Sequence, residues 1–128
     1  MQDYHHLIVW QKAHVLATSI HLLSARIPRV GNADAISQMR RAALSVPSNI
    51  AEGCGRSTDR DFAKFLMISF GSASELESQL EYAAATALIS REDLEARRAE
   101  IVQIRRMLTG LIRRVQPKTM SEIDSRET

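Results

Sequence analysis

Arginine side chains recur along one face of the helix predicted at residues 91–115. At about 100° per residue, five of them fall within about 100° of one another: Arg91, Arg98, Arg105, Arg106 and Arg113. Guanidinium groups hold phosphates through charge and paired hydrogen bonds, so this row predicts contact with an RNA or DNA backbone. The alternative is a solvated helix face that Glu92 and Glu95 partly neutralise. No aromatic side chain interleaves the row, so stacking on bases is not indicated.

A second set of residues is predicted to stabilise the fold or a subunit interface: Arg40, Arg41, Asn49, Glu52, Gly71, Ser72 and Glu75. Arg40 borders the apolar seam of its helix, and we expect it to pair with a carboxylate such as Glu75. Arg41 points away from that seam, and we expect it to pair with Glu52 or with a neighbouring subunit. Contact of either arginine with a ligand or a phosphate is the alternative interpretation.

The sequence does not indicate catalysis, a cofactor or a metal site. Its histidines have no metal-binding partner four residues away, and no carboxylate completes a metal motif: they are His5, His6, His14 and His21. No Ser-His-Asp or paired-carboxylate pattern occurs. The segment at residues 53–58 precedes a predicted helix, but it lacks the strand and the lysine of a phosphate-binding loop. We therefore predict a protein that is not an enzyme.

Composition indicates a cytoplasmic globular protein of ordinary charge. The 128-residue chain has a net charge of +2, and its one cysteine, Cys54, cannot form an internal disulfide. A single cysteine fits a reducing compartment. No apolar run approaches the length of a membrane span, and the start of the sequence does not resemble a secretory signal.

Apolar residues repeat every three and four positions through most of the chain. This heptad spacing predicts four helices, at about residues 5–27, 33–53, 59–88 and 91–115. Short loops between helices that each carry one apolar stripe predict an antiparallel up-down-up-down four-helix bundle, all-α, within a single domain at residues 1–116. The polar tail at residues 117–128 is predicted to be disordered.

Proline and glycine mark special positions within these helices. Pro47 predicts a kink rather than a break, with Asn49 forming hydrogen bonds beside it. The segment Gly53-Cys54-Gly55 is expected to end its helix, with a glycine supplying a left-handed cap. Gly71 lies in a small-residue patch with Ser72. Glycine destabilises a helix interior by about 1 kcal/mol relative to alanine. We therefore predict that close packing at Gly71, inside the bundle or between subunits, offsets this loss.

Three blocks of residues carry a resemblance to a known family. The most specific lies at residues 38–56, with QMRRAA at 38–43, SNIAEG at 48–53, and Arg56. The others are VWQKA at residues 9–13, and Phe65-Leu66 followed by Gly71-Ser72, Glu75-Leu76 and Gln79-Leu80. Over about residues 4–115 the chain resembles the bacterial four-helix-bundle family of 23S ribosomal-RNA intervening-sequence proteins. That family includes the accessory variability determinant of diversity-generating retroelements.

The resemblance implies a homopentameric ring without known catalytic activity. In the retroelement branch the family protein binds nucleic acid and a partner reverse transcriptase, whereas other members are encoded inside ribosomal RNA genes. We therefore expect a non-enzymatic oligomeric scaffold or adaptor that contacts RNA, DNA or a nucleic-acid enzyme through its arginine-rich face. The alternative is a structural protein-interaction oligomer with no nucleic-acid affinity.

Overall fold

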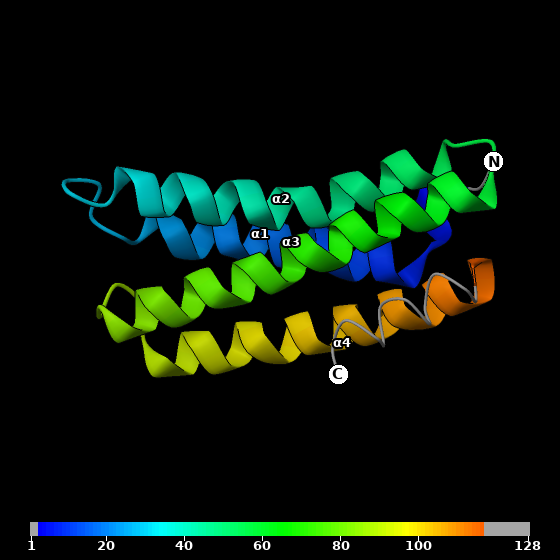
Figure 1. The fold of residues 1–128 in the computed structure, drawn as a ribbon. Coiled ribbons are helices and arrows are strands. Elements are labelled where there is room, and N and C mark those ends of the chain that lie inside the picture. The colour runs from blue at the N-terminus through cyan, green and yellow to red at the C-terminus, as the bar shows by residue number, and fades with distance from the viewer. Residues whose placement is uncertain (1–2, 117–128) are drawn as a thin grey trace.

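The computed structural model describes residues 3–116, and within that range it contains helices and turns but no strand. A 3-10 turn, η1 (Tyr4–His6), precedes four α-helices: α1 (Ile8–Ala25), α2 (Ala33–Cys54), α3 (Asp59–Ala85) and α4 (Arg91–Val115). The α1–α2 and α3–α4 connections lie at one end of the elongated bundle, and the α2–α3 connection lies at the other (Figure 1). The tail predicted to be disordered lies outside the described residues.

The core forms where the heptad seams of the four helices meet. Leu16, Val46, Leu76 and Ile104, one from each helix, are fully buried. Each such side chain contributes about 1.5–3 kcal/mol when it leaves water. The most extensive packing joins α2 to α3, and α1 packs less extensively against α4 than against α2. Within residues 3–116 no helix is both long and apolar enough to cross a membrane.

Hydroxyl side chains cap two of the helices. The Thr58 Oγ1 accepts a hydrogen bond from the Asp61 N–H at 3.1 Å, at the start of α3. The Ser90 Oγ accepts one from the Asp93 N–H at 3.0 Å, at the start of α4. These bonds satisfy N–H groups that have no partner within the helix, which is why Ser and Thr favour this position.

The third helix ends three residues before its predicted end at residue 88. Ala87 adopts a positive φ of 62°, a left-handed conformation that costs a non-glycine residue roughly 1–2 kcal/mol. The Leu88 N–H donates to the Ala83 carbonyl at 2.8 Å, and the Ala87 N–H donates to the Ala84 carbonyl at 3.1 Å. This pattern is a Schellman ending built on alanine rather than glycine, and for that reason the sequence did not reveal it.

The predicted left-handed glycine cap at residues 53–55 is wrong. The helix α2 continues through Gly53 to Cys54, and the residue after it, Gly55, has a φ of −84°. A Cβ on Gly53 would meet the Phe62 Cδ1 at 2.9 Å and the Phe65 Cβ at 3.0 Å. Gly53 is therefore required for the close approach of α2 to α3 just before their connection.

Candidate nucleic-acid and subunit interfaces

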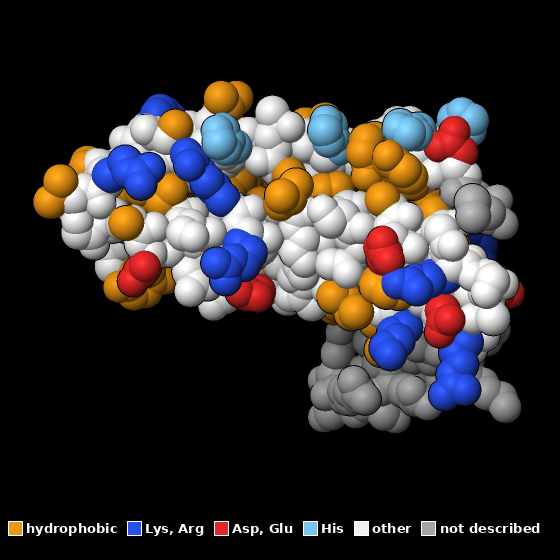
Figure 2. Space-filling model, turned by 90° about the horizontal axis from the view of Figure 1, so that it is seen from above, with side chains coloured by type: hydrophobic (Ala, Val, Ile, Leu, Met, Phe, Trp, Pro, Cys, Tyr) orange, Lys and Arg blue, Asp and Glu red, His pale blue; other side chains and the backbone are white. Residues whose placement is uncertain are grey.

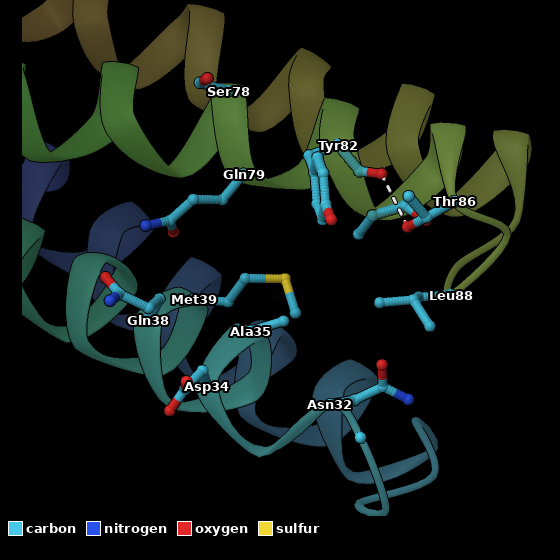
Figure 3. Close-up of a pocket in the computed structure, with 12 residues that line it drawn as sticks. Asn32, Asp34, Ala35, Gln38, Met39, Ser78, Gln79, Tyr82, Thr86 and Leu88 are labelled. Atoms are coloured by element: carbon cyan, nitrogen blue, oxygen red, sulfur yellow. Dashed lines mark hydrogen bonds between the residues drawn. The ribbon is translucent and has the colours of Figure 1, made fainter.

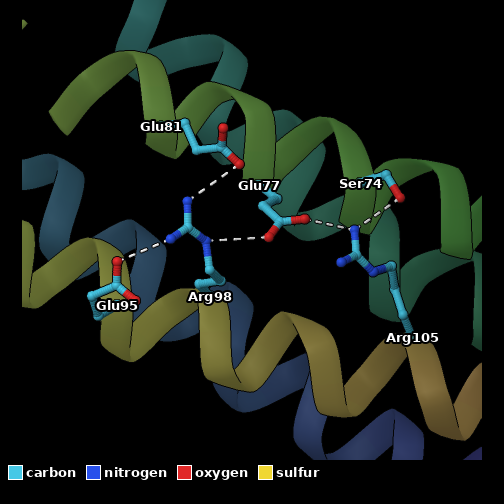
Figure 4. Close-up of polar contacts among 6 residues, drawn as sticks. All are labelled: Ser74, Glu77, Glu81, Glu95, Arg98 and Arg105. Atoms are coloured by element: carbon cyan, nitrogen blue, oxygen red, sulfur yellow. Dashed lines mark hydrogen bonds and ion pairs between the residues drawn. The ribbon is translucent and has the colours of Figure 1, made fainter. Parts of the chain in front are cut away.

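Arg98, in the middle of the predicted arginine row, is surrounded by carboxylates (Figure 4). It lies 3.4 Å from Glu77 and 3.4 Å from Glu81, both on α3, and 2.9 Å from Glu95 on its own helix. Burial opposes the charged form, but the nearby carboxylates outweigh it and raise the pKa of the Arg98 guanidinium above its ordinary value. The charge of Arg98 is thus largely balanced within the fold.

Arg105 is held by the same carboxylate. Its Nη1 lies 2.7 Å from the Glu77 Oε1 and donates to the Ser74 Oγ at 3.2 Å. Glu77, whose side chain is 17% exposed, therefore bridges two arginines of α4 (Figure 4). This network joins α4 to α3. The side chains of Glu77, Arg98 and Arg105 are mostly buried, so solvent and salt screen their attraction less than they would at an open surface.

The remaining arginines of the row are more exposed to solvent. Arg91, Arg106 and Arg113 are exposed, and so is Arg114, which the predicted row did not include. Arg91 and Arg106 form no ion pair with any other described residue. Arg113 and Arg114 lie in the last turn of α4, where cations stabilise the helix dipole. The row thus divides into a pair bound to α3 and an exposed remainder.

Arg40 does not pair with Glu75 as expected. Its Nε donates to the Ser24 Oγ at 2.7 Å and its Nη2 to the His21 carbonyl at 3.4 Å, so it joins α2 to α1. Glu75 instead accepts a hydrogen bond from the Gln79 Nε2 at 3.1 Å. The periodicity placed Arg40 beside the seam, but it could not show which neighbouring helix lay across from it.

Arg41 is exposed and forms no ion pair within residues 3–116. The expected partner, Glu52, lies 2.6 Å from Arg56, one helical turn further along the chain. A contact of Arg41 with a neighbouring subunit stays a prediction.

Small polar side chains link α2 to α3 near Pro47. The Ser45 Oγ lies 2.7 Å from the Ser72 Oγ, and the Asn49 Nδ2 donates to the Ser45 carbonyl at 2.8 Å. The helix α2 continues unbroken past the proline. Ser72 and Asn49 therefore form hydrogen bonds within one chain.

Gly71 is not packed inside the bundle. It is exposed, and a Cβ there would meet no described atom within 4 Å. One of the two predicted explanations, close packing within the bundle, is therefore wrong. Packing between subunits stays a prediction for this residue.

The sequence reasoning missed a second apolar row on α1. Ile8, Val15 and Leu22 are spaced by seven residues and are 58%, 61% and 63% exposed. Leu44, from α2, is 61% exposed and lines the same shallow hollow as Leu22. Figure 2 shows histidine side chains in a row along this region of the surface, with hydrophobic side chains beside them. The heptad spacing of the row was visible in the sequence, one position before the buried seam.

The sequence and the all-helical fold of this chain are both similar to those of known proteins. The family model described as 23S rRNA-intervening sequence protein matches residues 5–110. The chain belongs to this family. A crystal structure from Bacteroides thetaiotaomicron, of a protein with unknown function from the S23 ribosomal protein family, has a similar fold with a TM-score of 0.74. The two are 27% identical over 82% of this chain and 98% of that chain. No curated protein matches the chain.

The family match confirms the resemblance inferred from the three blocks of residues. It includes the exposed row on α1 and the α3–α4 ion-pair network, but it stops before Arg113 and Arg114. The similar structure is described as having unknown function, so neither it nor the family assigns an activity. Within residues 3–116 no group of three His, Cys, Asp or Glu side chains could hold a metal ion.

Proposed function

We propose that this family member is a non-enzymatic scaffold, an antiparallel up-down-up-down bundle that assembles with copies of itself into a ring. The observation that carries the proposal is the row of Ile8, Val15 and Leu22, which is exposed beside the face of α1 that the core buries. Heptad-spaced apolar side chains are the seam by which one helix packs against another. An apolar row left in water is unfavourable, and such surfaces mark interaction sites.

A second copy of this chain offers a matching surface on α3. Ile68 is 44% exposed, and it shares a face with Gly71 and Glu75, at spacings of three and seven residues. Gly71 would let another helix approach closely. The segment of α1 contains no acidic residue and includes Lys12, so its charge complements Glu75. Contact between unlike faces of successive copies closes into a ring when the rotation permits.

The assembly is tested by the mass of the full chain in solution. We expect light scattering at micromolar concentration to give a multiple of the chain mass of 14.4 kDa, and five times that mass for the pentamer that the family resemblance implies. A mass of one chain at this concentration would contradict the scaffold proposal.

Nucleic-acid binding is the second candidate function, and the exposed arginines of α4 favour it. Arg91 and Arg106 retain guanidinium groups that no described carboxylate neutralises. A ring would repeat these groups on every subunit, which raises avidity without new contacts. The partner in this case is RNA, DNA or a nucleic-acid enzyme of the reverse-transcriptase kind. Arg98 and Arg105, which are already paired, contribute less.

Replacing both Arg91 and Arg106 by glutamine tests this second function. If each contacts single-stranded RNA, the slope of log K against log salt becomes shallower by about 1.4, since each phosphate contact contributes about 0.7. A filter-binding titration at several salt concentrations measures the slope. The exposed cations Arg29 and Arg60 lie outside α4, and their replacement by glutamine should leave the slope unchanged. A chain that binds no RNA at low salt would exclude the arginine mechanism.

A further inference from the structure

A cleft of about 600 Å³ opens between the first half of α2 and the last half of α3. Its floor is apolar and includes Ala35, Met39 and Leu88, and its walls carry uncharged hydrogen-bonding side chains. Figure 3 shows Gln38 and Gln79 reaching from opposite helices toward one another, and Tyr82, further along α3, pointing into the gap between the two helices. The volume lies within the range of sites for small organic ligands.

Gln79 carries an acceptor that the described residues leave unused. Its Nε2 donates to the Glu75 Oε1 at 3.1 Å. Because a carboxylate only accepts hydrogen bonds, the amide nitrogen must face Glu75 and the amide oxygen must face away from it. That oxygen, Oε1, is buried and has no hydrogen-bond partner among the described residues. Met39, which also lines the cleft, is unbranched and flexible, so the lining can adjust to a ligand.

The remaining groups of the cleft select for the shape and charge of a ligand. Tyr82 is 65% exposed and presents a ring at the rim, where a planar group can stack. No Lys or Arg lines the cleft, so it offers no cation for a phosphate. Its one charged lining residue, Asp34, turns its carboxylate away from Tyr82 and Gln79 (Figure 3). A planar, uncharged ring with both donors and acceptors on its edge fits these features.

We propose that the α2–α3 cleft binds a nucleobase. The edge of a base pairs with side-chain amides, its face stacks on an aromatic ring, and its sugar and phosphate stay outside. Gln79 and Gln38 supply the amides, and Tyr82 supplies the ring. The inference goes beyond self-assembly and does not depend on it, because every group that it uses lies within one chain.

Equilibrium dialysis of the full chain against the four ribonucleosides tests the proposal. At least one nucleoside should bind saturably, with one site per chain. Tyr82→Ala should weaken its binding about tenfold, since base stacking is lost. Gln79→Leu, which keeps the side-chain volume, should weaken binding about fivefold through the lost hydrogen bond. Leu44→Ala is the matched control, because Leu44 is 61% exposed but lies outside the cleft.

Two further ligands separate base recognition from other binding. Ribose 5-phosphate tests the sugar and phosphate alone, and benzyl alcohol tests an apolar ring without an amide edge. The proposal is overturned if no nucleoside binds, if either of these ligands binds as tightly, or if Tyr82→Ala leaves the affinity unchanged. Light scattering on the same samples keeps the outcomes distinct: a monomer that binds nucleosides would contradict the scaffold but support the cleft.

Discussion

Replacing Gly53 by valine is expected to lower the free energy of unfolding by about 2–3 kcal/mol, the cost of overpacking a core. The first added carbon would lie 2.9 Å from the Phe62 Cδ1, 3.0 Å from the Phe65 Cβ and 3.3 Å from the Phe62 carbonyl oxygen. Two of these atoms belong to backbone or lie next to it, so they cannot swing aside. The overlap can be relieved only if α2 and α3 separate near their connection. Urea denaturation followed by circular dichroism measures the change.

Gly110→Val is the matched control for this prediction. Gly110 also lies within a helix, but a Cβ there would meet no described atom within 4 Å. The change in helix propensity is the same at both positions and favours valine by a few tenths of a kcal/mol. The difference between the two variants therefore isolates packing. Equal stability of the two would show that α2 and α3 do not approach closely at Gly53.

The core and the hydroxyl caps at the starts of α3 and α4 could be predicted from the sequence because they depend on local spacing. A seven-residue repeat places Leu16 and Leu23 on one side of a helix whatever lies opposite, and burial follows once any apolar partner arrives. Thr58 and Ser90 cap their helices through N–H groups only three residues away. These features need no knowledge of how the helices are arranged.

The cross-helix contacts could not be predicted in this way. The bridge from Glu77 to Arg98 and Arg105 depends on the register of α3 against α4, which a periodicity does not contain. Glu75 and Glu77 lie two residues apart and so face different directions. Only the structure shows that Glu77 faces the arginines. The same limit applies to Arg40, because the register of α2 against α1 that brings it to Ser24 is not contained in the periodicity either.

The exposed row on α1 was missed for a different reason. The helix carries two heptad patterns in adjacent registers, one through Val9 and Leu16 and one through Ile8 and Val15. A single-chain bundle can bury only one of them. The sequence therefore contains an apolar surface in excess of what one bundle uses, and this excess is the physical reason to expect a partner.

Replacing Val15 and Leu22 together by aspartate is expected to dissociate the assembly into single chains. Burial of these side chains between subunits would contribute about 1.5–3 kcal/mol each, and a buried carboxylate without a partner costs more. Since 1.4 kcal/mol changes a dissociation constant tenfold, the loss should exceed a hundredfold. Light scattering at micromolar concentration measures the mass.

Two companion variants decide what such a dissociation means. Val30→Asp introduces one such charge at a residue that is 94% exposed in the α1–α2 connection, away from the apolar row, and should leave the mass unchanged. Gly71→Val fills the close-approach position on α3 and should reduce the mass if α1 of one copy packs on α3 of the next. If Gly71→Val keeps the full mass while the α1 variant dissociates, the α1 row instead faces another surface, and the ring must close through a contact that excludes Gly71.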